Sequence, residues 1–317
     1  MKTVLIAGAG QLGSRHLQGV KLSANELDIW VYDLSAESLK VAEERYNQVE
    51  SPTEKTAHFV QSLSEVPTDI DVTIVASSSK PRYAIVTELL ASHNVKYMVL
   101  EKFLFPRMSD YDEIAALLKE KNVTTFVNCP RRMFESFSVV KEYIDATKPV
   151  VMTKGGKDWG LCCNSIHFID IFMYLTGEAD YTLNVDGIIP EVVDSKRGGY
   201  VELRGTEVIE TPNGSRLTLT STVDYDGDTS LIIKNGDTSI ILNEGNGDVD
   251  INGKIYNTAV KYQSGLSGIV VDDLLAIGTC PLTTYDDSAR YHKPFLSIIA
   301  PLINKLKGWT SDSCPIT

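Results

Sequence analysis

Three glycines near the start of the chain have the spacing of a phosphate-binding turn. Gly8, Gly10 and Gly13 follow the apolar run VLIA in the pattern GxGxxG. In such a turn the first glycine permits a sharp bend, the second lets a phosphate approach the backbone, and the third lets the next helix lie close to the strand. The free N–H groups and the dipole of the helical stretch GSRHLQGVKLS would then face a pyrophosphate. This pattern predicts a dinucleotide site.

An acidic residue lies where ribose recognition is expected. Asp33 ends the run WVYD, and it follows Gly13 by about 20 residues. A carboxylate there accepts hydrogen bonds from the 2′-hydroxyl of an adenosine ribose and repels a 2′-phosphate. Leu34 and Ser35, which follow it, provide no cation to offset that repulsion. The sequence therefore predicts NAD in preference to NADP. The alternative is a sharp strand-to-helix turn with an unrelated surface aspartate.

Two further side chains are suited to the oxidation of an alcohol. That reaction needs a base for the hydroxyl proton while a hydride leaves, and the imidazole of His167 has the chemistry of such a base. Lys102 follows the run YMVLE, at a strand end where ligands gather on open α/β sheets, and its ammonium would stabilise negative charge on the reacting oxygen. The alternatives are a buried core histidine in SIHFIDIFMYL and a solvated lysine paired with Glu101.

The neighbours of His167 have two interpretations each. Asp170 lies three residues later on the same helical face, where it either orients the imidazole or is a buried carboxylate bound by backbone or by an arginine such as Arg131. Asn164 either caps the helix or presents its amide to a sugar hydroxyl. Cys163 is either a small filler or a weak thiol donor in a pocket. The five cysteines are odd in number and show no CxxC pair, so we expect free thiols and no metal site.

The elements that must position these residues differ between two parts of the chain. Up to about residue 125, short β-branched runs alternate with amphipathic stretches, which predicts βαβ units and a doubly wound parallel sheet. From about residue 181 to 262, short alternating runs are separated by Asn-Gly and Asp-Gly pairs, which are typical of tight hairpins. We predict a dinucleotide-binding Rossmann domain over residues 1–125 and an α+β domain with a predominantly antiparallel sheet over 126–317.

Composition limits the class of partner. The 317 residues include 30 Lys and Arg against 42 Asp and Glu, a net charge of −12, and the acidic residues are spread along the chain. We therefore expect no nucleic-acid partner. No apolar run approaches the roughly 20 residues that span a bilayer, and the amino-terminal run is too short for a signal-peptide core. These features favour a cytoplasmic protein that acts on a small molecule and has no membrane partner.

Several segments together resemble the Gfo/Idh/MocA (glucose-fructose oxidoreductase / inositol dehydrogenase) family. In chain order they are GAGQLGSRH, VASSSKPR, LEKFLF, VNCPRRM, CNSIHFIDIFMYLTG and CPLTTYDDSARYHKPFL. The resemblance implies a Rossmann domain followed by an α+β domain whose open sheet builds a homodimer or homotetramer. It also implies an active site between the domains and an NAD(P)-dependent oxidoreductase that transfers a hydride to or from a sugar, cyclitol or nucleotide-sugar.

The same resemblance implies roles for individual residues. Lys102 and His167 would be catalytic. The cofactor would be bound by Gly8, Gly10, Gln11, Leu12, Gly13, Asp33, Ser77, Ser78, Arg82, Glu101 and Asn128. The substrate would be bound by Lys102, Arg131, Cys163, Asn164 and His167, and no metal is implied.

The chain departs from the motifs of this family at three places. Phe103 replaces the proline of the usual Glu-Lys-Pro, and Ser77–Ser78 with Arg82 stand where Thr-Pro and then His are common. Cys163 lies four residues before His167, where the family has its catalytic Asp. The last departure leaves two alternatives to a dehydrogenase. One is an NAD-using lyase or glycosidase without net redox change, and the other is a non-catalytic NAD-binding sensor.

Overall fold

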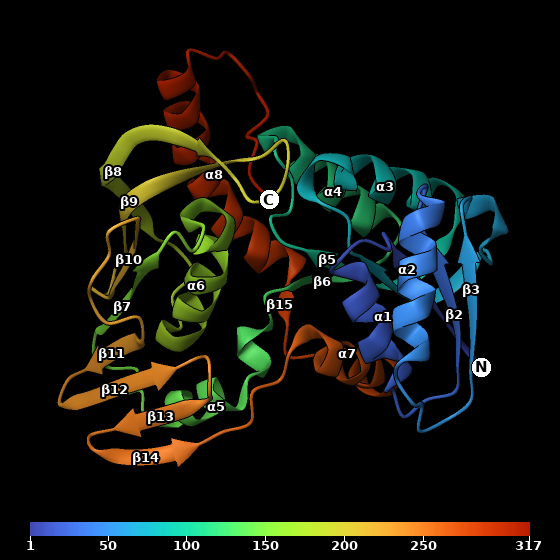
Figure 1. Ribbon diagram of the computed structural model, residues 1–317, viewed down its shortest axis with the longest axis horizontal. Helices are drawn as coiled ribbons and strands as arrows, with labels where there is room; N and C mark the ends of the chain where they lie inside the picture. Colours follow the sequence, from blue (N-terminus) through green and yellow to red (C-terminus); the bar gives the residue numbers. More distant parts are fainter. The chain divides into compact units, whose positions relative to one another are not determined.

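The computed structural model describes all of residues 1–317, and the chain divides into two compact units. Unit 1 comprises Met1–Phe105, Ser109–Pro130 and Lys261–Tyr285, and unit 2 comprises Pro106–Met108, Arg131–Val260 and Asp286–Thr317. The chain therefore returns to unit 1 late in the sequence. In Figure 1 this late segment is the orange-brown helix α7 beside the blue helix α1.

Unit 1 is built on a seven-stranded sheet of order β15-β6-β5-β4-β1-β2-β3. β1 to β6 pair in parallel, whereas the short β15 pairs antiparallel to β6. The strand order reverses beside β1, and in such sheets ligands bind at the carboxyl ends of the strands near that reversal. The strands are β1 (Lys2–Ala7), β2 (Leu27–Tyr32), β3 (Lys55–Val60), β4 (Asp69–Val75), β5 (Asn94–Glu101), β6 (Thr124–Asn128) and β15 (Thr283–Thr284).

Helices cover both faces of this sheet, which explains its nearly continuous apolar strands. α1 (Gly13–Lys21), α2 (Ala36–Asn47) and α7 (Gln263–Ile277) lie on one face, with α3 (Ser79–Ser92) and α4 (Met108–Glu120) on the other (Figure 1). A short 3₁₀ helix, η1 (Leu63–Glu65), precedes β4. The predicted doubly wound parallel sheet is confirmed.

Two glycines let α1 and α7 approach each other closely. A Cβ on Gly268 would lie 2.5 Å from the carbonyl oxygen of Gly19, and a Cβ on Gly19 would lie 2.9 Å from the Cβ of Ser267. Helix backbones can only come this near where side chains are absent. The packing therefore fixes α7 firmly on the helix that follows the glycine turn.

Unit 2 contains an eight-stranded sheet of order β14-β13-β12-β11-β7-β10-β9-β8. Every neighbouring pair is antiparallel except β7 and β10, which are parallel. The prediction of a second, predominantly antiparallel sheet is thus confirmed. The strands are β7 (Val150–Lys157), β8 (Thr182–Asp194), β9 (Val201–Glu210), β10 (Arg216–Thr222), β11 (Leu231–Asn235), β12 (Thr238–Asn243), β13 (Asp248–Ile251) and β14 (Lys254–Asn257).

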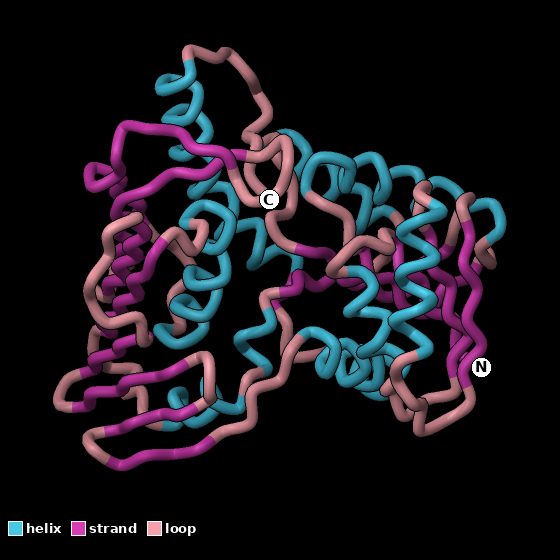
Figure 2. Tube along the Cα trace, in the orientation of Figure 1, coloured by secondary structure: helices cyan, strands magenta, loops and turns pink.

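One face of this second sheet is covered by helices. α6 (Leu161–Thr176) packs on β7, β9 and β10, and α5 (Glu135–Glu142) packs on β13 (Figure 2). η2 (Pro130–Met133) precedes α5, and α8 (Tyr285–Lys307) comes near the end of the chain. α6 is apolar almost all round because nearly all of it is buried. None of the helices combines the length and the apolar character that crossing a membrane requires.

Candidate cofactor and substrate sites

The glycine turn joins β1 to α1, and each of its glycines has a different environment. Gly8 has a φ of +103°, a conformation that favours glycine. A Cβ on Gly13 would lie 1.8 Å from the carbonyl oxygen of Gly8, whereas a Cβ on Gly10 would find no atom within 4 Å. Helix–strand packing therefore requires the third glycine, and the second borders open space where a phosphate can reach the backbone.

The first turn of α1 supplies amide donors next to this space. The first hydrogen bonds of the helix run from the Ser14 amide to the Gly10 carbonyl, at 3.0 Å, and from the His16 amide to the Leu12 carbonyl, at 2.9 Å. The amides of Gln11 and Leu12 come before these bonds, and the first amides of a helix have no acceptor within it. Together with the helix dipole they form a site suited to a pyrophosphate.

Asp33 follows β2 directly and is fixed beside the glycine turn. Its Oδ2 accepts a hydrogen bond from the Ala9 amide at 2.7 Å, and its Oδ1 accepts one from the Ser35 amide at 2.8 Å. Both bonds orient the carboxylate without consuming all of its acceptor sites. The side chain is thus held where an acceptor for ribose hydroxyls is expected.

A cavity of about 200 Å³ borders the turn, with walls from the glycine turn and from α2. The guanidinium of Arg45 donates to Gln11 Oε1 at 2.7 Å and to Ser14 Oγ at 2.6 Å. Arg45 and its neighbour in the cavity, Glu37, are not among the residues expected from the sequence, because only the packing of α2 on α1 brings them to the turn. The lining residues are Ala9, Gly10, Gln11, Glu37, Ser38, Val41 and Arg45.

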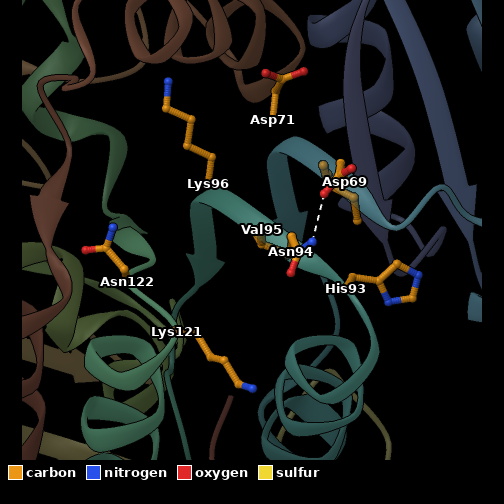
Figure 3. Close-up of a pocket in the computed structure, with 9 residues that line it drawn as sticks. Asp69, Asp71, His93, Asn94, Val95, Lys96, Lys121 and Asn122 are labelled. Carbon is orange, nitrogen blue, oxygen red and sulfur yellow. Dashed lines mark hydrogen bonds between the residues drawn. The ribbon is translucent and has the colours of Figure 1, made fainter.

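A second cavity, of about 370 Å³, lies at the amino-terminal ends of the strands of the same sheet (Figure 3). It forms where β4 and β5 begin, and Asn94 Nδ2 donates there to Asp69 Oδ1 at 2.8 Å. Dinucleotides bind at the carboxyl ends of parallel strands, so this cavity is separate from the candidate cofactor site. Its lining residues are Asp69, Ile70, Asp71, His93, Asn94, Val95, Lys96, Lys121 and Asn122.

The loop after β4 touches the glycine turn. A Cβ on Gly8 would lie 3.0 Å from the Ser77 amide nitrogen, so the two loops are in contact. The hydroxyl of Ser77 is buried without a hydrogen-bond partner in the protein, which leaves it available to a bound molecule. Ser78 is the N-cap residue of α3, although its side chain makes no capping bond.

Arg82, in the first turn of α3, is fully buried. Its guanidinium donates to the carbonyl oxygens of Ser77 and Phe103 and, at 2.8 Å, to that of Leu104. These bonds join the loop after β4 to the loop after β5. The structure therefore places Arg82 behind both loops, where it supports their backbones.

Glu101 and Asn128 end neighbouring strands and are both buried. The Asn128 amide donates to the Glu101 carboxylate, and His16 Nε2 lies 2.8 Å from Glu101 Oε1. Burial by itself would raise the pKa of Glu101, but the hydrogen bonds from His16 and Asn128 and the nearby charge of Arg82 outweigh it. The pKa therefore lies below the usual value. Glu101 is an ionised acceptor in the interior.

Lys102 follows Glu101 at the carboxyl end of β5. The glycine turn lies at the carboxyl ends of the strands as well. Lys102 is 9% exposed, and its peptide bond to Phe103 is cis. Phe103, Leu104 and Phe105 have no exposed surface, so their side chains anchor the loop that carries the lysine.

In unit 2, α6 carries the candidate substrate residues Cys163, Asn164 and His167, all half-buried. The helix begins at Leu161 with Gly160 as its N-cap residue, so the prediction that Asn164 caps it is wrong. The Asn164 amide instead donates back to the carbonyl oxygens of Trp159, at 2.8 Å, and Gly160, at 2.9 Å.

A carboxylate from a distant strand caps α6 in place of Asn164. Glu202 of β9 accepts hydrogen bonds from the amides of Cys162, at 2.9 Å, and Cys163, at 3.0 Å. A negative charge at a helix N-terminus is favourable. No local pattern in the sequence identifies this cap, because Glu202 lies some forty residues away in the chain.

Cys163 and His167 are four residues apart and share one face of α6. The Cys163 thiol lies 3.9 Å from Ser195 Oγ. Arg131 lies 4.2 Å over the ring of Phe168, and its Nε donates to Glu244 Oε1 at 2.8 Å. Of the residues expected to bind substrate, Cys163, Asn164 and His167 thus lie on one helix with Arg131 beside it, whereas Lys102 belongs to unit 1.

Asp170 is a buried carboxylate held by an arginine, one of its two predicted roles. The partner is Arg132, whose Nε and Nη2 donate to the two carboxylate oxygens at 2.8 and 2.9 Å. Arg131, the example expected from the sequence, pairs with Glu244 instead. The two adjacent arginines therefore have different carboxylate partners, which their sequence does not distinguish.

Residues 2–129 match the sequence model of an oxidoreductase family with an NAD-binding Rossmann fold, GFO_IDH_MocA. No curated protein matches the chain at the level of sequence.

Solved structures are similar to the chain over nearly its whole length. UDP-N-acetylglucosamine 3-dehydrogenase from Acidithiobacillus ferrooxidans has a TM-score of 0.74 at 15% identity, covering 97% of this chain and 99% of its own. An oxidoreductase from Agrobacterium radiobacter, in complex with NAD+, L-tartaric acid and magnesium, has a TM-score of 0.72 at 15% identity, covering 96% and 97%. GenD2 from gentamicin A biosynthesis, in complex with NAD, has a TM-score of 0.68 at 16% identity, covering 96% and 95%.

At these identities the solved structures show that the fold is shared. The family match shows in addition that residues 2–129 have the sequence of an NAD-binding Rossmann domain. The predictions of the family and of NAD as its cofactor are confirmed. Residues 2–129 thus match the sequence pattern of the Gfo/Idh/MocA family of oxidoreductases with an NAD-binding Rossmann fold.

Proposed function

We propose that the chain is an NAD-dependent dehydrogenase or reductase that transfers a hydride between the nicotinamide and a hydroxyl or keto group of a sugar, cyclitol or nucleotide-sugar. The glycine turn carries the proposal. Gly10 borders open space, Gly13 admits no Cβ, and Asp33 is fixed beside them by the Ala9 amide. The substrate class is supported by the similarity to a dehydrogenase of UDP-N-acetylglucosamine.

The residues of unit 1 fit the parts of NAD. The amides of Gln11 and Leu12 would bind the pyrophosphate, and Asp33 would accept hydrogen bonds from the adenosine ribose. The buried hydroxyl of Ser77 would be a further donor. When bound, NAD supplies the hydride acceptor or donor.

Lys102 and His167 would act on the substrate. The Lys102 ammonium would hydrogen-bond the reacting oxygen and stabilise its negative charge, more strongly than in water because the side chain is largely buried. His167 would take or give the hydroxyl proton. Cys163 cannot stabilise an imidazolium as a carboxylate would. The proton path therefore differs from that of the family, or the substrate supplies a polar group of its own.

Titration calorimetry with NAD and NADP tests the cofactor assignment. We expect NAD to bind more tightly than NADP, and Asp33→Asn to weaken NAD binding by about tenfold, the effect of losing one charge-assisted hydrogen bond. Asp28→Asn is the matched control, since Asp28 pairs with His58 outside the turn. Absence of heat with either dinucleotide would overturn the proposal.

Turnover with a panel of sugars, cyclitols and nucleotide-sugars, followed by NADH absorbance, tests the reaction. His167→Asn should lower kcat by roughly 10²–10⁴-fold, the usual contribution of a general base, while NAD binding stays unchanged. Full turnover in this variant would remove His167 from the catalytic role.

The presence of Cys163 in place of Asp favours a second candidate, an NAD-using lyase or glycosidase without net redox change. Such an enzyme would release product at substoichiometric NAD without accumulating NADH. Tight NAD binding without turnover of any substrate would instead indicate a sensor.

We further propose that the chain is cytoplasmic and forms a homodimer or homotetramer through the face of the second sheet opposite α6. Hydrogen-bond register aligns Val208, Thr218, Thr153, Ile232 and Ile241 in one row across this face. Ile241 is 40% exposed. Polar and β-branched side chains in such a row are suited to packing against a second copy.

A further inference from the structure

A largely buried polar network within unit 1 joins four elements near the glycine turn, namely α1, β5, β6 and α7. His16 lies one turn into α1 and is 1% exposed. Its Nε2 lies 2.8 Å from Glu101 Oε1 at the end of β5, and its Nδ1 lies 2.9 Å from Ser267 Oγ of α7. One imidazole therefore connects the helix after the glycine turn to the strand end that precedes Lys102.

The network continues through two side-chain amides. Gln263 Nε2 donates to Ser267 Oγ at 3.1 Å and lies 3.3 Å from His16 Nδ1. Gln263 Oε1 accepts from Asn128 Nδ2 at 2.8 Å, and the same Asn128 amide donates to Glu101. The bonds form a closed ring of five side chains. Gln263 is half-buried and the other four side chains are buried. A polar network whose members all have partners fixes one arrangement of its elements.

Because Glu101 is charged, its hydrogen bond with His16 is the bond of the network whose loss would cost most. Because the pKa of Glu101 is lowered, the carboxylate is ionised and can only accept hydrogen bonds. The proton between the two groups therefore belongs to His16 Nε2. An ionised carboxylate that is 3% exposed is costly unless it is paired, so loss of His16 would force the end of β5 to move or to admit water.

We propose that His16 is a positioning residue for cofactor binding, which acts through Glu101 and holds the first turn of α1 in register with the strand end that carries Lys102. His16 itself is too buried to touch a ligand. The inference rests on the proposed function, in which the start of α1 binds the pyrophosphate and Lys102 the reacting oxygen. His16 follows Gly13 by one helical turn and Glu101 adjoins Lys102, so the link is short on both sides.

Titration calorimetry of NAD binding to the full chain tests the proposal without requiring a substrate. His16→Ala and Glu101→Gln should each weaken NAD binding by about tenfold, the effect of one charge-assisted hydrogen bond. The double variant should bind no more weakly than His16→Ala alone, because both substitutions act on the same link. His16→Gln keeps an N–H donor and should regain part of the affinity lost in His16→Ala.

Two controls separate positioning from folding. His58→Ala removes an imidazole that is also paired with a carboxylate in unit 1, but outside the turn, and should leave NAD affinity unchanged. Urea unfolding without NAD shows which variants keep the fold. If His16→Ala fails to fold, Ser267→Ala, which removes only the second anchor of the imidazole, should still weaken NAD binding severalfold.

The outcomes are distinct. If the wild type binds NAD and the folded His16 and Ser267 variants bind it with the same affinity, this inference is overturned and the proposed function stands. Additive losses in the double variant would also overturn it. No binding by the wild type would overturn both.

Discussion

Single glycines in the turn after β1 differ in what a side chain would meet. Gly13 faces the carbonyl oxygen of Gly8, so its missing Cβ is a requirement of folding, whereas Gly10 faces open space and is free of any such requirement. Gly13 is therefore needed for stability and Gly10 for ligand binding, although the sequence pattern does not distinguish the two roles.

Alanine at each position provides the first prediction. Gly13→Ala should lower the free energy of unfolding by about 1–3 kcal/mol or more, as overpacking against backbone does. Gly10→Ala should leave that free energy nearly unchanged and weaken NAD binding by at least about tenfold, because the methyl group would stand where the phosphate approaches. Urea unfolding and calorimetry measure the two effects. Equal loss of stability in both variants would contradict the assignment.

At the scale of elements, α6 is attached to β9 by two buried carboxylates. Glu202 caps the helix N-terminus, and Glu207 accepts a hydrogen bond from Ser165 Oγ at 2.6 Å. Burial raises the pKa of Glu207 to about 8, despite the opposing hydrogen bond from Ser165 and with a further rise from the charge of Glu202. Glu207 is therefore protonated at neutral pH, and α6, which carries His167, packs on a neutral acid.

This pKa predicts how stability depends on pH. Between the usual value of 4.5 and about 8, the folded chain keeps a proton on Glu207 that the unfolded chain releases. The contribution of Glu207 to the free energy of unfolding therefore falls as pH rises through this window. Glu207→Gln should remove that contribution and make the protein more stable than the wild type at pH 8.

Urea unfolding at pH 5, 6.5 and 8 measures the effect. Glu210→Gln on the exposed end of the same strand is the control and should leave the pH dependence of the wild type intact. A Glu207→Gln protein with the wild-type slope would show that Glu207 does not hold its proton.

At the scale of the whole molecule, the covered and uncovered faces of the second sheet have different compositions. The buried strand residues of β9 and β10, on which α6 packs, include Ile209, Leu217 and Leu219, together with Glu207, which is hydrogen-bonded to Ser165 of α6. The opposite face presents the row that includes Ile241 and continues to Asp250 and Ile255. Covering this row in an oligomer would remove apolar surface from water, at roughly 25 cal/mol per Å² of apolar area.

Ile241→Lys should therefore convert the oligomer to monomers, because it places a charge in the proposed interface. Light scattering after size-exclusion chromatography measures the mass, and circular dichroism verifies that the fold is kept. Ile277→Lys is the matched control, since Ile277 is 71% exposed but ends α7 in unit 1. A wild-type protein that is already monomeric would contradict the proposed assembly.

The sequence by itself determined the features that depend on near neighbours in the chain. The glycine spacing, the position of Asp33 after its strand, and the alternation of strands and helices are set by local backbone geometry and side-chain periodicity, so they could be predicted and agree with the structure. The antiparallel second sheet could be predicted for the same reason, since its Asn-Gly and Asp-Gly turns are local.

Only the tertiary structure decided which distant residues pair with a buried charged group or cap a helix. Glu202 rather than Asn164 caps α6, Arg132 rather than Arg131 holds Asp170, and Arg82 lies behind two loops. The link from His16 to Glu101 joins residues 85 positions apart. Buried polar groups must find partners wherever packing brings them, and that choice depends on the positions of whole elements, which a pattern along the chain does not contain.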